Sequence, residues 1–171
     1  MSEEKRMKLS RMIKYIVRLL RIVSVIILSC TVLLAAALVL PRMFGVVPYT
    51  VVTGSMAPEI PVGAIVYVDT NSEAPQPDDV IAFRVSDGTM VTHRVVAVQD
   101  GEYITKGDAN AGEDLAPVSA SQVLGRCVFR IPFIGYLFLV PALKYSWLAV
   151  TLSSIIVLMI LGKKGLVHYE K

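Results

Sequence analysis

The hexapeptide Thr53-Gly54-Ser55-Met56-Ala57-Pro58 lies between a long apolar run and the first of several strand-like runs. Gly54 allows a tight backbone turn and Pro58 restricts its exit, so Ser55 is predicted to sit on an exposed turn. A hydroxyl in that position is either a candidate nucleophile or part of an ordinary turn. The hexapeptide alone leaves both interpretations open.

The composition indicates membrane segments. Of the 171 residues, 54% are hydrophobic, which is high for a soluble domain of this size. Residues 22–40 form an uncharged apolar run that is long enough to span a bilayer. A cleaved signal peptide ending near Ala35 to Ala37 is the alternative, but the run exceeds the usual apolar core of such peptides. We therefore predict a retained transmembrane helix at residues 22–40.

Charge is distributed unevenly along the chain. The start is basic, through Lys5, Arg6, Lys8, Arg11, Lys14, Arg18 and Arg21, whereas the acidic residues gather in the middle. This asymmetry favours membrane topology over nucleic-acid binding. By the positive-inside rule, residues 1–21 are predicted to be cytoplasmic and the chain beyond Pro41 to be extracytoplasmic.

Residues 41–135 are expected to form a compact antiparallel β domain, because short runs rich in Val, Ile, Tyr and Phe alternate with turn residues. Strands are predicted at Val62 to Val68, Val80 to Val85, Met90 to Val98, Glu102 to Thr105 and Val123 to Phe129. Asp87-Gly88 and Asp100-Gly101 are typical of tight hairpin turns.

A second apolar segment, residues 136–161, is predicted to contain a returning transmembrane helix. Its uncharged core runs from Tyr145 to Leu161, at the short end for a span, and Lys163 and Lys164 follow. Residues 162–171 would then be a cytoplasmic tail. The stretch from Phe133 to Leu143 either lies in the interface or lengthens this span. If the segment does not cross, the C-terminus stays outside.

The two cysteines offer no cross-link or metal site. Cys30 lies in the first apolar run and Cys127 in the outer domain, so no disulfide between them is expected. Cys127, beside Val128 and Phe129, is interpreted as a small buried residue. Histidines and cysteines do not cluster at metal-ligand spacing, and we predict neither a metal nor a cofactor.

His93 is the candidate general base for Ser55. The second histidine, His168, lies in the C-terminal tail, across the membrane from Ser55 in the predicted topology. Strand alternation puts His93 on one face with Val91, Val95 and Ala97. An apolar neighbourhood disfavours the imidazolium, and a neutral imidazole can accept a proton. A structural histidine within the sheet is the alternative.

A serine nucleophile needs a neighbouring base, and an imidazole base works best when a carboxylate fixes its tautomer. The loop Thr105-Lys106-Gly107-Asp108-Ala109-Asn110-Ala111-Gly112-Glu113-Asp114 follows the next strand and offers Asp108, Glu113 and Asp114. An acidic, solvated turn is the simpler interpretation of this loop. Spacing does not choose among the three carboxylates.

Several motifs in this order resemble type I signal peptidases. They are Thr53-Gly54-Ser55-Met56-Ala57-Pro58, Asp79-Val80-Ile81, Thr92-His93-Arg94-Val95, Thr105-Lys106-Gly107-Asp108-Ala109-Asn110 with Asp114, and Ile131-Pro132-x-x-Gly135-Tyr136. Within that family the chain is similar to the endoplasmic-reticulum-type branch, also found in archaea and some Gram-positive bacteria. His93 stands where the common bacterial branch has a catalytic lysine.

The resemblance implies Ser55 as nucleophile, His93 as general base and Asp114 as the acid, with Asp108 as a second important carboxylate that orders the loop. The Ser55 backbone N–H is the natural oxyanion donor, and the Thr53 hydroxyl could add a second bond. Many relatives have serine at the position of Thr53 and asparagine at that of Ala111.

The function expected from this resemblance is a membrane-bound serine endopeptidase that cuts signal peptides from exported preproteins after small residues. It would work at a multi-pass cell membrane, with lipid and preproteins as partners and accessory membrane subunits left open; a prokaryote is favoured over the endoplasmic reticulum. A non-catalytic β module that binds extended peptides at a sheet edge is the alternative. A protease that cleaves its own linker, near Ala35 to Ala37, is a second alternative.

Overall fold

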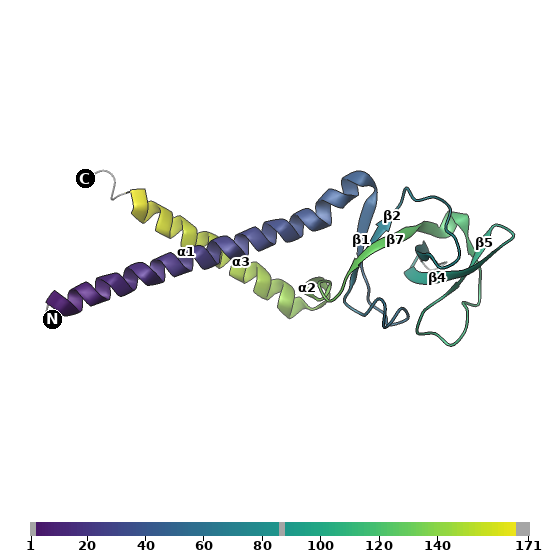
Figure 1. The fold of residues 1–171 in the computed structure, drawn as a ribbon, viewed down its shortest axis with the longest axis horizontal. Helices are drawn as coiled ribbons and strands as arrows, with labels where there is room; N and C mark the ends of the chain where they lie inside the picture. Colours follow the sequence, from purple (N-terminus) through teal and green to yellow (C-terminus); the bar gives the residue numbers. More distant parts are fainter. Residues whose placement is uncertain (1–2, 86–87, 167–171) are drawn as a thin grey trace. The chain divides into compact units, whose positions relative to one another are not determined.

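The computed structural model describes residues 3–85 and 88–166. Two compact units are distinguished within the chain. Residues 37–143 form one unit and contain the whole β-sheet, and the remaining helical residues form the other. Figure 1 follows the chain by colour and labels most of its helices and strands.

Two helices are long and apolar enough to cross a membrane. Helix α1 spans Glu3–Val39 and helix α3 spans Pro141–Leu166. Their most apolar stretches have mean hydropathies of 2.8 and 2.0. At 1.5 Å per residue, α1 is about 55 Å long, which is well beyond the roughly 30 Å of a bilayer core. The apolar part of α1 is long enough to cross the bilayer by itself, so the basic first part of the helix is not needed for the crossing.

Hydroxyl groups within these helices find partners in the helix backbone. Thr31 Oγ1 donates to the carbonyl of Ile27, and Ser154 Oγ donates to the carbonyl of Val150. Thr151 and Ser153 make similar bonds one turn back. A hydroxyl satisfied in this way needs no water, so these residues are compatible with a lipid environment.

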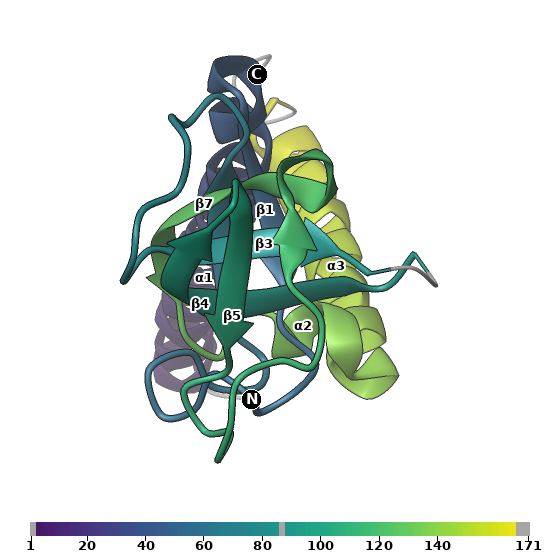
Figure 2. The same cartoon turned by 90° about the vertical axis from the view of Figure 1, so that its right-hand side faces the viewer.

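The β domain is built on one antiparallel sheet of seven strands in the order β1-β2-β7-β3-β4-β5-β6. Its strands are β1 (Val46–Thr50), β2 (Ile65–Asp69), β3 (Val80–Arg84), β4 (Met90–Gln99), β5 (Glu102–Lys106), β6 (Val118–Ser119) and β7 (Val123–Ile131). Figure 2 labels β3, β4 and β5, which are neighbours in this order in the sheet. The expected antiparallel β domain with apolar helices at both ends is confirmed.

Two groups of buried side chains form the core of this sheet. One contains Met56, Ile60, Val66 and Val68, and the other contains Ile81, Phe83, Val95, Tyr103 and Val118. Each of these side chains is at most 6% exposed. The first group includes residues of the loop that carries Ser55, so that loop is anchored in the core.

The strand predictions need three corrections. β2 begins at Ile65 instead of Val62, because Gly63 adopts φ 80° in a turn that a strand cannot contain. Strands β1 and β6 were not predicted. β1 contains Pro48, which is tolerated because β1 is an edge strand, and β6 has only two residues.

The hairpin turn at Asp100-Gly101 is confirmed. Both residues have positive φ, 51° and 82°, as expected for the type I′ turn that joins β4 to β5. Asp87 of the other predicted turn lies outside the described residues, as does His168.

At the second apolar segment, a short helix α2 (Tyr136–Leu139) precedes α3. α3 begins at Pro141, four residues before the predicted uncharged core at Tyr145, and the added residues include Lys144. The end of the Phe133 to Leu143 stretch thus lengthens this helix.

Candidate active site

Ser55 lies in the loop that joins β1 to β2. The base of this loop is closed by two backbone bonds, from Val51 N–H to Ala64 O and from Gly63 N–H to Val51 O, each 2.9 Å. Met56 and Ile60 are 1% and 2% exposed, so they fix the loop to the core directly after Ser55. Ser55 itself is half-buried. Ser55 therefore lies on a loop that is fixed at its base by backbone hydrogen bonds and in the core by Met56 and Ile60.

Met56, Ile60 and Phe83 are core residues, and Val62 is half-buried. The three core side chains are therefore not available to line an exposed substrate pocket or to contact lipid.

The acidic loop after β5 contacts Ser55 directly. The backbone N–H of Ala109 donates to the Ser55 carbonyl oxygen over 2.8 Å. Gly107 lies so close that a β-carbon on it would stand 2.7 Å from the same oxygen. A side chain at position 107 would force the loop or Ser55 to move. The backbone of the acidic loop therefore helps to fix the position of Ser55.

His93 is held inside the sheet on β4. Its residue is 7% exposed, it pairs with Ile81 of β3, and its ring meets the Phe83 ring at 6.2 Å between centroids. Val95, two residues on, is fully buried on the same face, as alternation predicts. The alternation then stops, because a bulge between Val95 and Ala97 interrupts the ladder with β5.

His93 pairs with Asp114. Its Nδ1 lies 2.6 Å from Asp114 Oδ2. The same carboxylate oxygen accepts a hydrogen bond from Thr105 Oγ1, also over 2.6 Å. An ionised carboxylate only accepts, so this contact puts the imidazole proton on Nδ1 and leaves Nε2 as the proton acceptor. Of the carboxylates that spacing left open, Asp114 is the one in contact with the histidine.

Asp108 has a different partner. Its two oxygens accept from Arg94 Nε at 2.9 Å and Arg94 Nη2 at 2.8 Å, a bidentate fork. Arg94 Nη2 also donates to Glu59 Oε2 over 2.7 Å, and Arg130 binds the other oxygen of Glu59. The hydrogen bond with Asp108 is the main reason that the pKa of Arg94 is raised.

The Arg94 network joins three segments around the site. Glu59 belongs to the Ser55 loop, Arg94 follows His93 on β4, and Asp108 belongs to the acidic loop. Arg94 therefore links the two loops from the strand that carries the histidine.

The hydroxyls of Ser55 and Thr53 point to no protein partner. In the part of the chain that the structure describes, neither makes a side-chain hydrogen bond, and Thr53 is exposed. Ser55 Oγ is thus not hydrogen-bonded to the imidazole here. Catalytic hydrogen bonds in unliganded enzymes are often formed only with substrate.

Cys127 is a poor candidate for chemistry. Cys127 is only partly buried, packed against the first core group, so the prediction of a buried residue is met in part. Desolvation by this burial raises the pKa of the thiol to about 12, so the thiolate that reacts is scarce at neutral pH. Cys127 is a free thiol, as is Cys30. Across residues 3–85 and 88–166, there is also no group of three or more His, Cys, Asp or Glu side chains that could hold a metal ion.

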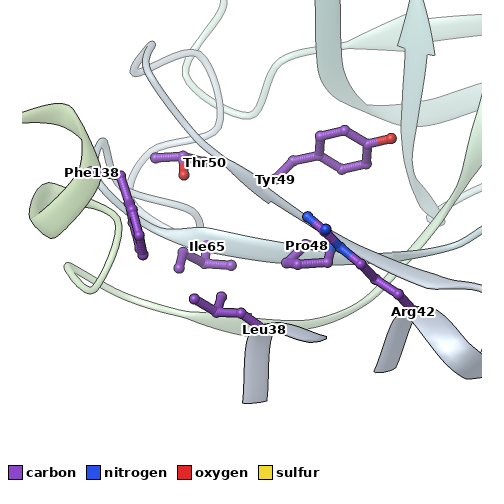
Figure 3. Close-up of a pocket in the computed structure, with 7 residues that line it drawn as sticks. All are labelled: Leu38, Arg42, Pro48, Tyr49, Thr50, Ile65 and Phe138. Carbon is purple, nitrogen blue, oxygen red and sulfur yellow. The ribbon is translucent and has the colours of Figure 1, made fainter. Parts of the chain in front are cut away.

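A separate small pocket of about 160 Å³ lies near the start of the sheet (Figure 3). Its lining consists of Leu38, Arg42, Pro48, Tyr49, Thr50, Ile65 and Phe138. None of these residues belongs to the Ser55, His93 and Asp114 group, so the pocket is distinct from the candidate active site.

Sequence reasoning missed Thr105, Arg94 and Glu59. The sequence did contain a signal for Thr105, because strand alternation puts it on the same face of β5 as Tyr103. The structure shows that this face is buried, with the two residues 1% and 6% exposed. A polar residue at a buried strand position calls for a hydrogen-bond partner. Arg94 and Glu59 are 35 residues apart, and nothing local indicated their contact.

Comparison with known proteins gives the family of the chain. Residues 22–110 match the family described as Signal peptidase, peptidase S26. The chain belongs to the signal peptidase family. It is 38% identical over 99 residues to Signal peptidase I W of Bacillus subtilis (strain 168). That alignment covers 54% of this chain and 52% of the relative, so the chain spans about half the length of the relative it matches. Ser55 and His93 lie within the family match; Asp114 lies four residues beyond it.

Proposed function

We propose that this protein is a membrane-bound serine endopeptidase that removes signal peptides from exported preproteins. The observation that carries the proposal is the 2.6 Å contact between His93 Nδ1 and Asp114 Oδ2. Asp114 belongs to the acidic loop, and the Ala109 N–H of the same loop donates to the Ser55 carbonyl oxygen. Family membership and the similarity to a bacterial signal peptidase I support the same substrate class.

In the proposed mechanism, His93 Nε2 takes the hydroxyl proton of Ser55 while Ser55 Oγ attacks the scissile carbonyl carbon. Asp114 stabilises the imidazolium that forms. The tetrahedral intermediate then collapses: the C–N bond breaks, and the imidazolium gives its proton to the amine of the departing mature protein. The signal peptide remains as an ester on Ser55.

Deacylation repeats these steps with water. His93 takes a proton from the water, the resulting hydroxide attacks the ester, and the proton returns to Ser55 Oγ as the signal peptide leaves with a free carboxylate. In both tetrahedral intermediates, the oxyanion would be stabilised by the Ser55 N–H and the exposed Thr53 hydroxyl.

The edge of β4 offers a place for an extended substrate. Residues Met90 to His93 pair with β3 on one side, and the ladder with β5 begins only at Arg94. A peptide that added a strand along this edge would pass directly beside His93, with backbone hydrogen bonds fixing its position. Small side chains before the cut, as in signal peptides, suit such a close approach.

The predicted topology fits this substrate. The end of α1 at Val39 is 16 residues before Ser55, so a short stretch of chain tethers the serine to the membrane surface at which α1 is proposed to end. With the N-terminus cytoplasmic, that surface is extracytoplasmic, where the cleavage sites of membrane-threaded preproteins emerge. Two crossings and any accessory membrane subunits belong to this proposal.

Cleavage of a labelled preprotein in detergent or liposomes tests the function. We expect the wild type to cut once, after a small residue, and both Ser55→Ala and His93→Ala to lose turnover while a cooperative thermal melt shows that each variant is still folded. Intact mass of the enzyme before and after the assay separates substrate cleavage from self-cleavage. Binding of the preprotein without any cutting by the wild type would instead favour the peptide-binding module.

A further inference from the structure

Thr105 occupies a buried position on β5 that faces the candidate site. Its residue is 1% exposed, and it pairs with Val95, which lies two residues after His93 on β4. The strand register therefore brings Thr105 to the buried face that also carries His93. A hydroxyl in that position loses its water and must be hydrogen-bonded within the protein.

The Thr105 hydroxyl meets the carboxylate that serves His93. Thr105 Oγ1 donates to Asp114 Oδ2 over 2.6 Å, and this is the same oxygen that His93 Nδ1 approaches to 2.6 Å. The Thr105 carbonyl in turn accepts the backbone N–H of Asp114 over 2.8 Å. One residue thus binds both the backbone and the carboxylate of Asp114.

Asp114 needs this support because it does not lie on a strand or helix. Its side chain is 23% exposed and sits in irregular chain after β5. Within the described residues, only His93 and Thr105 hydrogen-bond to its carboxylate. Without the Thr105 hydroxyl, rotation of the carboxylate toward water would be opposed by the imidazole contact alone.

We propose that Thr105 is a positioning residue that orients Asp114 toward His93. This inference rests on the proposed serine mechanism and adds a fourth side chain to it. Thr105 does not touch the reacting atoms; it acts through the carboxylate. Short hydrogen bonds to a charged group are among the stronger ones in proteins, so losing this one should affect turnover measurably.

The first test is Thr105→Val, which keeps the side-chain shape and removes the donor. We expect kcat for preprotein cleavage to fall by roughly 10- to 100-fold, the range for one hydrogen bond to a charged group, with KM within about twofold of the wild type because binding does not use Asp114. A wild-type kcat would overturn the proposal.

Thr105→Ser and Thr105→Ala form the matched pair. Both lose the methyl group, and they differ only by the hydroxyl, so any packing cost is shared. We expect the serine variant to keep most of the wild-type kcat and the alanine variant to lose as much as Thr105→Val. Equal kcat values for the pair would overturn the proposal even if Thr105→Val did not fold.

A double-mutant cycle with Asp114→Asn asks whether Thr105 acts through Asp114. We expect Thr105→Val to lower kcat much less in the Asp114→Asn background than in the wild type, because the carboxylate it positions is gone. If the fold-losses in kcat of the two single variants multiply in the double variant, the inference is contradicted.

Ser55→Ala is the reference variant. If Ser55→Ala still cleaves the preprotein, the proposed function fails. If Ser55→Ala is inactive and Thr105→Val is fully active, only the role of Thr105 is rejected.

Discussion

At the scale of single residues, two aspartates in one acidic loop serve different partners. Asp114 contacts the His93 imidazole, and Asp108 is held by the Arg94 guanidinium. The first contact acts on the proposed base itself. The second joins the acidic loop to β4 and, through Glu59, to the loop of Ser55.

Asp114→Asn and Asp108→Asn should therefore differ in effect. We expect Asp114→Asn to lower kcat by about 10³- to 10⁴-fold with little change in melting temperature, as for loss of a triad acid. Asp108→Asn should lower kcat by roughly tenfold and also lower the melting temperature, because it loosens an ion-paired link between loops. Steady-state cleavage and thermal melts measure both. An Asp108→Asn variant that melts normally but is as inactive as Asp114→Asn would contradict these roles.

The Cys127 thiol gives a prediction about pH. Its pKa is raised from 9.0 to about 12 by burial, so at pH 8 the folded protein should hold roughly 1000-fold less thiolate than the unfolded chain. In a Cys30→Ser background, maleimide labelling should be slow when folded and fast in denaturant. Since a raised thiol pKa favours the neutral form, the folded state should lose stability as pH rises above 9. Equal labelling rates in both states would show that the thiol is not buried.

At the scale of elements, the acidic loop controls the position of the Ser55 loop by close backbone contact. The Ala109 N–H donates a hydrogen bond to the Ser55 carbonyl oxygen. Gly107 lies so close to the same oxygen that an added β-carbon would clash with it. A backbone atom cannot rotate away from an added side chain as a flexible side chain can. Substitutions that move the backbone of the acidic loop should consequently displace Ser55.

Gly107→Ala tests this coupling. Its new β-carbon would meet Ser55 O at 2.7 Å, and a displacement of the serine by about 1 Å can cost roughly 100-fold in rate. We expect kcat/KM to fall by at least about tenfold. Gly112→Ala in the same loop is the control, because no atom lies within 4 Å of its added β-carbon. The coupling is wrong if the two variants cleave preprotein equally well.

At the scale of the whole molecule, the β domain and the basic start of α1 are predicted to lie on opposite sides of the membrane. Leu115, fully exposed in the β domain, and Met7, 53% exposed in α1, report on the two sides. With Cys30→Ser and Cys127→Ala as background, a membrane-impermeant maleimide should label Leu115→Cys in intact cells and Met7→Cys only after permeabilisation. Labelling of both, or of Met7→Cys alone, in intact cells would reject the topology.

Much of the architecture was predictable because its signals are local. The uncharged run at residues 22–40, the runs rich in β-branched and aromatic residues in β3, β4 and β5, and the turn at Asp100-Gly101 each follow from neighbouring side chains. β1 escaped prediction because Pro48 opposes a strand, and its edge position overrides that signal only in the folded sheet.

The sequence by itself determined the apolar helices, the antiparallel domain between them and a short set of candidates: Ser55, His93 and the carboxylates of one loop. Only the tertiary structure decided that Asp114 contacts His93, that Asp108 binds Arg94, and that Thr105 bonds to Asp114. The physical reason is that helix and strand formation depends on periodicity along the chain. Hydrogen-bond partners instead depend on strand register and loop path, which bring together residues such as Glu59 and Arg94 from distant parts of the chain.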